Sequence, residues 1–361
     1  MSLSKLAVGI IGVGGIAFGK HLPALAKRDD VEIVAFCDVI EANATRGAKE
    51  YGSIDARVFT DYKQLLAMDK LDAVYVLTAN HLHAEVSIAA LQAGKHVMCE
   101  KPMATSVEEA KAMMDAAHAS GKILTIGYQN RFRKDSLYLK QACEHGELGH
   151  IYHAKALAIR RRAVPTWGNF LSKAMQGGGP LIDIGTHALD LTLWLMDNYK
   201  PTTVFGATYD YLGKRENFAN AWGPWDDKKY EVEDSAFAMI AFENGATVHL
   251  EASWALNTLE VGEAKTSLYG TLAGADMRDG LRINGEKHGR LYTEIPDLNV
   301  PSRLVGSATS EQESDVEAAH FIDCIKEQRH PIVTPEQSFV VTKILSAIYE
   351  SASRRQPVSF S

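Results

Sequence analysis

Three residues that could move or stabilise a proton occur at two places in the chain. Lys101 stands in the tripeptide Glu100-Lys101-Pro102, after an apolar stretch, and Asp183 and His187 stand four residues apart, after three glycines. A lysine can donate a hydrogen bond, and its charge favours the alkoxide form of an alcohol. A histidine accepts a proton near neutral pH, and an aspartate can orient it. These residue types suit removal of a proton from a hydroxyl group.

Plainer interpretations compete at each place. A lysine in one tripeptide is more often a solvated surface residue, and His187 can simply pack between helices. If residues 181–190 are helical, Asp183, His187 and Asp190 share one face. Asp190 can then cap or pair locally, and the three side chains together can bind a metal. The residues alone leave catalysis, structure and metal binding open; we expect no metal site.

A glycine-rich turn near the start of the chain predicts a phosphate site. Its spacing is GxGxxA, between an apolar stretch at 6–11 and a helical pattern at 16–27. In dinucleotide-binding folds the first glycine permits the tight turn and the second lets the pyrophosphate approach the backbone. The following helix start attracts phosphate. A plain strand–helix turn is the alternative. The predicted contacts are Gly12, Gly14, Gly15, Ile16 and Ala17.

Asp38 bears on which dinucleotide would bind. It lies 21 residues after Ala17, at the end of the second apolar stretch, and is followed by Val39. A carboxylate there accepts hydrogen bonds from both hydroxyls of the adenosine ribose and repels a 2′-phosphate, and no arginine offsets the repulsion. We therefore expect NAD in preference to NADP, with NADP use left open. The alternative is an aspartate that caps a helix.

Apolar stretches alternate with helical patterns over the first 130 residues. This rhythm predicts a parallel α/β sheet with right-handed crossovers. The expected strands are 6–11, 31–37, 73–77, 96–99 and 123–127, and the expected helices are 16–27, 41–51, 82–93 and 106–119.

The rhythm changes after residue 130 to longer alternating stretches, which predict a second, α+β domain with a large, mostly antiparallel sheet. The expected strands are 150–159, 204–211, 235–242, 246–255, 265–270, 274–277 and 280–284, and the expected helices are 135–144, 313–327 and 335–354. Residues 214–229 predict a long loop, acting as a lid or an interface arm. The predicted boundaries are 1–130, 131–334 and 335–361.

Composition excludes several classes of protein. The chain has 361 residues and a formal charge of −7, and its only basic cluster is Arg160–Arg162, too small to bind nucleic acid. No apolar run reaches the ~20 residues of a membrane span, and we see no signal peptide. The four cysteines are far apart in the sequence. We expect reduced thiols and a cytoplasmic protein.

Taken together, these features resemble the Gfo/Idh/MocA oxidoreductase family over nearly the whole chain. The order and spacing of five motifs are more specific than any one of them. The motifs are Gly12-x-Gly14-x-x-Ala17, Thr78-Ala79-Asn80-His81-Leu82-His83, Glu100-Lys101-Pro102, Gly127-Tyr128-Gln129-Asn130-Arg131-Phe132 and the stretch from Gly177 to Asp190. The tail from Thr334 to Ser351 also resembles the final helix of this family, which packs back onto the Rossmann domain.

The resemblance implies roles for individual residues. Lys101 would contact both cofactor and substrate, and Asp183 and His187 would form a polar pair beside the nicotinamide, with His187 the general base. Arg131 and Trp167 would contact the substrate, with core packing the alternative for Trp167. The residues expected to line the cofactor site are Thr78, Asn80, His83, Glu100 and Gln129, with a structural role equally open for His83.

The implied activity is hydride transfer between nicotinamide and a secondary alcohol of a sugar or cyclic polyol, such as an inositol, a pyranose or an anhydrosugar. Two other classes stay open: a glycoside hydrolase that retains NAD and oxidises its substrate transiently, and a non-enzymatic sensor of sugars or nucleotides. The family also implies a homodimer or homotetramer.

Overall fold

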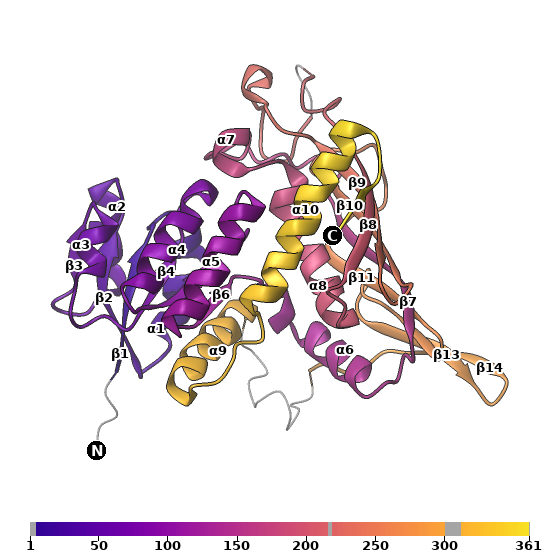
Figure 1. Ribbon diagram of the computed structural model, residues 1–361, viewed down its shortest axis with the longest axis horizontal. Coiled ribbons are helices and arrows are strands. Elements are labelled where there is room, and N and C mark those ends of the chain that lie inside the picture. Colours follow the sequence, from indigo (N-terminus) through magenta and orange to yellow (C-terminus); the bar gives the residue numbers. More distant parts are fainter. Residues whose placement is uncertain (1–4, 216–218, 300–311, 361) are drawn as a thin grey trace. The chain divides into compact units, whose positions relative to one another are not determined.

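The computed structural model describes residues 5–215, 219–299 and 312–360, and the chain folds into two compact units. The first unit comprises residues 1–129 and 311–342, and the second comprises residues 130–310 and 343–361. Figure 1 shows the elements of each unit.

A six-stranded parallel sheet forms the first unit, with the strand order β3-β2-β1-β4-β5-β6. This order reverses between β1 and β4, and ligands bind such sheets at that point, outside the carboxyl ends of the strands. The strands are β1 Leu6–Ile11, β2 Val31–Cys37, β3 Arg57–Phe59, β4 Ala73–Val76, β5 His96–Cys99 and β6 Leu124–Ile126. The helices are η1 Ala17–His21, α1 Leu22–Ala26, α2 Glu41–Tyr51, α3 Tyr62–Leu66, η2 Asn80–Leu82, α4 His83–Gln92, α5 Val107–Ser120 and α9 Glu313–Glu327. Helix η3 Gln129–Phe132 begins at the last residue of the segment 1–129 and continues into the second unit.

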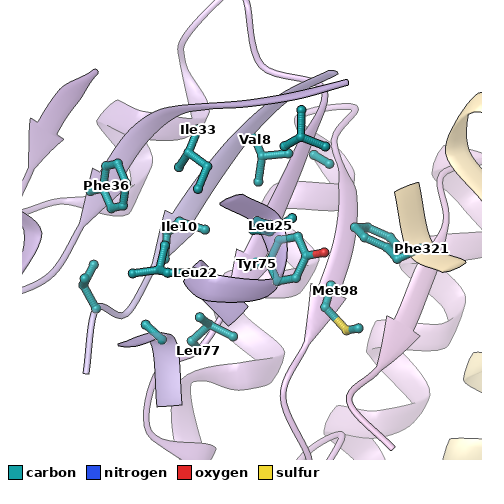
Figure 2. Close-up of a cluster of buried hydrophobic side chains, with 14 of the residues drawn as sticks. Val8, Ile10, Leu22, Leu25, Ile33, Phe36, Tyr75, Leu77, Met98 and Phe321 are labelled. Atoms are coloured by element: carbon teal, nitrogen blue, oxygen red, sulfur yellow. The ribbon is translucent and has the colours of Figure 1, made fainter. Parts of the chain in front are cut away.

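The core of the first unit explains why α9 belongs to it. Figure 2 shows Phe321 of α9 directed at the cluster that includes Tyr75 and Met98. The rings of Tyr75 and Phe321 meet edge to face, with centroids 5.6 Å apart. Our prediction had placed this helix in the second domain. Burial of Phe321 and its neighbour Ile322 in the Rossmann core places it in the first unit instead.

A nine-stranded sheet, antiparallel except between β7 and β10, forms the second unit in the order β14-β13-β12-β11-β7-β10-β9-β8-β15. These two sheets confirm the predicted fold class. The strands are β7 Ile151–Ile159, β8 Pro201–Tyr209, β9 Ser235–Phe242, β10 Thr247–Ser253, β11 Gly262–Gly270, β12 Ala273–Asp276, β13 Arg282–Lys287, β14 Arg290–Glu294 and β15 Val358–Ser359. The helices are α6 Lys134–Glu144, α7 Lys173–Gln176, η4 Leu181–Gly185, α8 Thr186–Met196 and η5 Asp227–Lys229.

Helix α10 Pro335–Arg354 passes from one unit to the other at Thr342. We had predicted that this helix packs on the Rossmann domain as a whole. Its first part groups with that domain, whereas the rest groups with the second unit, where the Ser351 hydroxyl accepts a hydrogen bond from the Gly206 amide at 3.0 Å.

Small residues let helix α8 lie close against the large sheet. Ala154, Ala156 and Ala158 alternate along β7 and are buried on the face that α8 contacts. The opposite face of the sheet carries exposed side chains such as Phe205 of β8 and Met239 of β9. This alternation is typical of a sheet with one covered face. Among the described helices, none combines the length and the hydropathy that a membrane span requires.

Three strands were missing from the prediction: β3, β14 and the two-residue β15. Strand β3 has three residues, too few to show an alternating pattern, and all five residues of β14 are exposed. A strand without a buried face leaves no hydrophobic period in the sequence. Within the predicted loop 214–229, residues 216–218 lie outside the described residues, and the rest is irregular apart from η5.

Candidate active site

The glycine turn lies between β1 and η1 in the first unit. Gly12 has a φ of +89°, and a Cβ there would lie 2.6 Å from the carbonyl carbon of Leu77. Any side chain at Gly12 would therefore collide with the strand β4 connection. Around Gly14 the situation is the opposite, because a Cβ there would meet nothing within 4 Å. The turn thus has an open outer side that a pyrophosphate can approach.

Asp38 ties this turn to the end of strand β2. Its Oδ2 accepts a hydrogen bond from the Val13 amide at 2.8 Å, and its Oδ1 accepts one from the Ile40 amide at 2.9 Å. The N-cap of α2 is Ile40, so Asp38 is not the helix cap that the sequence left open. Each carboxylate oxygen has two acceptor positions. The carboxylate can therefore also accept hydrogen bonds from ribose hydroxyls.

We expect the double variant Asp38→Ser, Val39→Arg to shift cofactor use toward NADP. The negative charge that repels a 2′-phosphate is removed, and an arginine that can pair with it is supplied at an exposed position. The ratio of kcat/KM for NADP over NAD should rise about tenfold or more, since one charged contact is worth roughly this much. Steady-state kinetics with both cofactors measures this. An unchanged ratio, in a variant with wild-type Tm, would remove Asp38 from the ribose site.

Glu100 precedes Lys101 and is buried rather than open to a cofactor. Its Oε1 lies 2.7 Å from Lys20 Nζ and 2.8 Å from His21 Nε2, and its Oε2 accepts from the Lys101 amide at 3.0 Å. Burial alone would raise the pKa of Glu100, but Lys20 and His21 outweigh it and hold that pKa well below its usual range. We had expected Glu100 to line the cofactor site. In the structure, Glu100 instead orients the backbone of Lys101 through the hydrogen bond to its amide.

Lys20 also meets a second carboxylate and an amide. Its Nζ lies 2.9 Å from Glu317 Oε2 and 3.1 Å from Gln129 Oε1. Burial raises the pKa of Glu317 to about 7, against the opposing effect of Lys20. Gln129, which we predicted at the cofactor, thus has its side-chain oxygen directed at Lys20. This buried group links η1, the Lys101 turn and α9.

His83 is a second residue whose predicted place changes. The ring is buried, with Nδ1 2.7 Å from the carbonyl oxygen of Pro102 and Nε2 3.0 Å from that of Thr78. Both ring nitrogens are therefore occupied by backbone, and burial lowers the pKa of His83. We assign His83 to holding the Lys101 turn against the end of β4. Asn80 begins the short helix η2 between these segments.

In the second unit, Asp183 lies on the π-helix η4 and His187 on the helix α8 that continues it. Both side chains are at least nine-tenths buried. The start of η4 is held by Glu233, whose carboxylate accepts from the amides of Gly179 at 3.0 Å and Leu181 at 3.1 Å and from the Tyr349 hydroxyl at 2.8 Å. Burial raises the pKa of Glu233, and these donors oppose that rise.

This clamp explains two of the three glycines before η4, and the first, Gly177, ends helix α7 with a φ of +87°. A Cβ on Gly178 would lie 2.0 Å from the Tyr349 hydroxyl, and one on Gly179 would lie 2.2 Å from the Glu233 carbonyl oxygen. The sequence predicted a close approach of backbone to some group at these glycines. The groups that approach are Glu233 and Tyr349, from segments more than 50 residues away, and no local pattern could reveal them.

Asp183 is surrounded by one indole and one guanidinium. Trp254 Nε1 donates to Asp183 Oδ2 at 3.0 Å, and Arg160 Nη1 lies 3.8 Å from the same oxygen. Arg160 is itself held by Glu263 through two bonds of 2.6 and 2.7 Å. Sequence reasoning did not single out Trp254. A buried carboxylate that an indole donor holds in place suits the orientation of a hydroxyl group.

Arg131 does not have the position that we predicted. Its side chain is fully buried and makes two bonds to Asp190, Nε to Oδ2 at 2.9 Å and Nη2 to Oδ1 at 2.5 Å. A guanidinium that is fully buried and paired in this way cannot contact a substrate. Asp190 therefore pairs with Arg131, and local pairing is one of the alternatives that the sequence leaves open for Asp190. By contrast, Trp167 is 53% exposed, which contradicts the core-packing alternative.

The donor set of the first unit fits a dinucleotide. Open space lies outside Gly14, and Asp38 retains acceptor capacity at the end of β2. The Thr78 hydroxyl is buried and finds no hydrogen-bond partner among the described residues. An orphaned polar atom of this kind is costly unless a ligand or water satisfies it. These features together define a dinucleotide-binding protein of the Rossmann class.

Comparison with known proteins names the family. Residues 6–128 match the oxidoreductase family with an NAD-binding Rossmann fold, and residues 136–276 match the GFO/IDH/MocA C-terminal domain. The chain belongs to the Gfo/Idh/MocA family of oxidoreductases, which confirms the predicted resemblance, the enzyme class and NAD as the cofactor.

Three relatives illustrate the range of similarity. D-glucoside 3-dehydrogenase of Escherichia coli is 37% identical over 98% of this chain and 97% of its own length. Levoglucosan dehydrogenase of Pseudarthrobacter phenanthrenivorans is 30% identical over 70% of this chain and 68% of its own. A solved structure of levoglucosan dehydrogenase, in complex with NADH and levoglucosan, shares the fold with a TM-score of 0.82 at 24% identity, covering 99% of each chain.

Proposed function

We propose that this enzyme oxidises a secondary hydroxyl group of a pyranose sugar or a glycoside with NAD. The observation that carries the proposal is the Asp183 site, where a buried carboxylate with a fixed indole donor lies on the same continuous helix as His187. The D-glucoside 3-dehydrogenase and levoglucosan dehydrogenase relatives support a sugar as the substrate. Inositol is the related polyol to test beside it.

The residues divide the chemistry as follows. His187 accepts the proton of the substrate hydroxyl, and Asp183 accepts a hydrogen bond that orients the sugar. Lys101 stabilises the negative charge that develops on the substrate oxygen. The nicotinamide, when bound, supplies the hydride acceptor. The chain's task is to hold the hydroxyl, remove its proton and keep the reacting groups in position.

Cofactor binding in this proposal falls to the open side of the first unit. The glycine turn, with Gly14, Gly15, Ile16 and the start of η1 after Ala17, would hold the pyrophosphate. Asp38 would hold the adenosine ribose, and Thr78 and Asn80 would lie along the cofactor. In this assignment Glu100, Gln129 and His83 hold the Lys101 turn in position and do not contact the cofactor.

A substrate screen tests the proposal. The candidate substrates are D-glucose, methyl D-glucosides, levoglucosan and myo-inositol. With each of them, the reduction of NAD and of NADP is followed by the absorbance of the reduced cofactor. We expect NADH to form with at least one sugar, and to form faster than NADPH forms from NADP with the same sugar. Release of an aglycone without net NADH would instead indicate the NAD-retaining hydrolase. Tight sugar binding with no turnover of any kind would indicate a sensor.

We also propose that two copies associate through the outer face of the large sheet, in a cytoplasmic homodimer or homotetramer. Phe205 and Met239 are paired neighbours on β8 and β9, both about half exposed, and Tyr209 packs on Phe237 on the same face with centroids 6.1 Å apart. Exposed apolar patches of this kind mark association surfaces. The free cysteines support a reducing compartment.

Charge on this outer face should dissociate the oligomer. We expect Phe205→Asp with Met239→Asp to convert a dimer to monomers, or a tetramer to dimers, because two carboxylates would have to be buried without partners. Size-exclusion chromatography with light scattering measures the mass. Leu291→Asp on the exposed β14 is the matched control and should leave the mass unchanged. A monomeric wild-type protein, or an unchanged mass in the double variant, would contradict the proposal.

A further inference from the structure

Six side chains of the second unit form a closed ring of contacts that begins and ends at the Asp183 carboxylate. On one side Trp254 donates to Asp183 at 3.0 Å, and the ring centroids of Trp254 and Phe170 lie 6.2 Å apart. On the other side Arg160 lies 3.8 Å from Asp183 and 5.0 Å above the Trp222 ring. The ring closes through Trp167, whose centroid is 6.0 Å from that of Phe170 and 5.0 Å from that of Trp222.

Exposure changes steeply across this ring. Trp254 is fully buried at the Asp183 side, whereas Trp222 is 42% exposed and Trp167 is 53% exposed at the far side. Two neighbouring indoles that are half exposed to solvent are unfavourable in free energy, since burial of each ring would stabilise the protein. The ring therefore has a buried polar end, which suits a hydroxyl group, and an open aromatic end, which suits a flat apolar group.

The open end is held in place although it lies in irregular chain. The Asn220 side chain accepts from the Val164 amide at 2.8 Å and donates to the Val164 carbonyl at 3.0 Å. The Thr166 hydroxyl donates to the Trp222 carbonyl at 2.9 Å. These bonds join the segment before Trp167 to the segment before Trp222. An aromatic surface fixed in advance binds a ligand with little loss of conformational entropy.

Arg160 sets the spacing between the two ends. Its guanidinium is held flat by Glu263 and bridges Asp183 and Trp222 by itself. The aromatic surface thus begins one guanidinium away from the carboxylate. A sugar whose hydroxyl group reaches Asp183 and whose substituent lies on the Arg160 side would place that substituent at the two indoles.

We propose that the exposed faces of Trp167 and Trp222 bind the aglycone of a glycoside, and that the preferred substrates are glycosides whose aglycone has a flat, apolar face. This inference rests on the proposed function. It gives the segment around residues 219–223 a part in substrate choice, which the sequence had left as a lid or an interface arm. The Trp167 and Trp222 rings meet at 68°, so a flat group can stack on one indole and meet the other at its edge. Both arrangements supply the preference, because aromatic pairs gain free energy beyond the area that they bury.

The test compares methyl and phenyl D-glucosides, in both anomeric forms, with NAD. The wild type should show kcat/KM about tenfold higher for a phenyl glucoside than for the methyl glucoside of the same anomer. Trp222→Ala and Trp167→Ala should each lower this phenyl-to-methyl ratio about tenfold, mainly through KM. Trp222→Phe, which keeps an aromatic face, should restore most of the ratio.

Tyr152→Ala is the matched control. Tyr152 is also a half-exposed aromatic residue, but it lies at the other end of β7 from Arg160, roughly 26 Å away along the strand. This variant should leave the ratio unchanged. A wild-type ratio near one, or equal ratios in the wild type and both alanine variants with unchanged Tm, would overturn the inference.

Direct binding separates this inference from the proposed function. Isothermal titration calorimetry measures the affinity for phenyl glucoside with NADH present. If no glucoside is oxidised, yet phenyl glucoside binds the wild type about tenfold more tightly than it binds Trp222→Ala, the aglycone site stands and the proposed reaction fails. If glucosides are oxidised with no phenyl preference, the reaction stands and the aglycone site fails.

Discussion

Replacing Lys101 or His187 by alanine will lower kcat by about a hundredfold to a thousandfold or more. Lys101 supplies the positive charge for the developing alkoxide, and the loss of one such donor costs this much. His187 removes the hydroxyl proton, and the loss of a general base costs a similar factor. Steady-state NADH formation with the best sugar from the substrate screen measures both losses, and circular dichroism verifies the fold.

Matched variants show whether these losses are specific. Lys63→Ala removes an exposed lysine at the start of α3 and should leave kcat unchanged. High pH should partly restore His187→Ala, because hydroxide can take the proton, but should not restore Lys101→Ala. Wild-type turnover in both alanine variants would exclude the roles assigned to these residues.

The second large effect concerns stability. Arg131→Ala should destabilise the second unit by about 3–5 kcal/mol, the usual cost of leaving one partner of a buried ion pair alone. Arg131 is fully buried, and it makes two bonds to Asp190 and one of 3.3 Å with the Tyr199 hydroxyl. Urea unfolding followed by tryptophan fluorescence measures the change.

The pH dependence of this variant gives a sharper test. Burial raises the pKa of Asp190, and Arg131 opposes that rise. Without Arg131 the folded-state pKa lies still further above the unfolded value of about 3.9. A raised carboxyl pKa costs stability as the pH rises above the unfolded value, so the loss should be smaller at pH 4 than at pH 7.

A paired replacement completes this test. Arg131→Met with Asp190→Leu removes both charges and should recover most of the stability, because no buried charge is left unpaired. If Arg131 contacted the substrate instead, its alanine variant would raise KM and keep the wild-type free energy of unfolding. That result would restore our original assignment of Arg131.

Most elements of the first unit, with β3 and α3 as exceptions, were predictable because each leaves a pattern in adjacent residues. Strands β1, β2 and β5 have the predicted bounds, as do helices α2, α9 and α10. Buried parallel strands are continuous apolar runs, and amphipathic helices repeat every 3.6 residues, so both leave a pattern in adjacent residues. The spacing of Gly12, Gly14 and Ala17 is likewise local.

The sequence by itself also placed Lys101, Asp183 and His187 in motifs that indicate the family, and the glycine turn with Asp38 indicated NAD. The tertiary structure decided what each polar side chain contacts. Arg131 pairs with Asp190, Glu100 with Lys20 and Glu233 with the start of η4, across 59, 80 and 54 positions of the chain. Such pairs form only when distant segments pack and bury their charges together, because burial makes a partner obligatory. Residue types and local spacing show which groups are present, and packing alone decides which of them remain available for substrate.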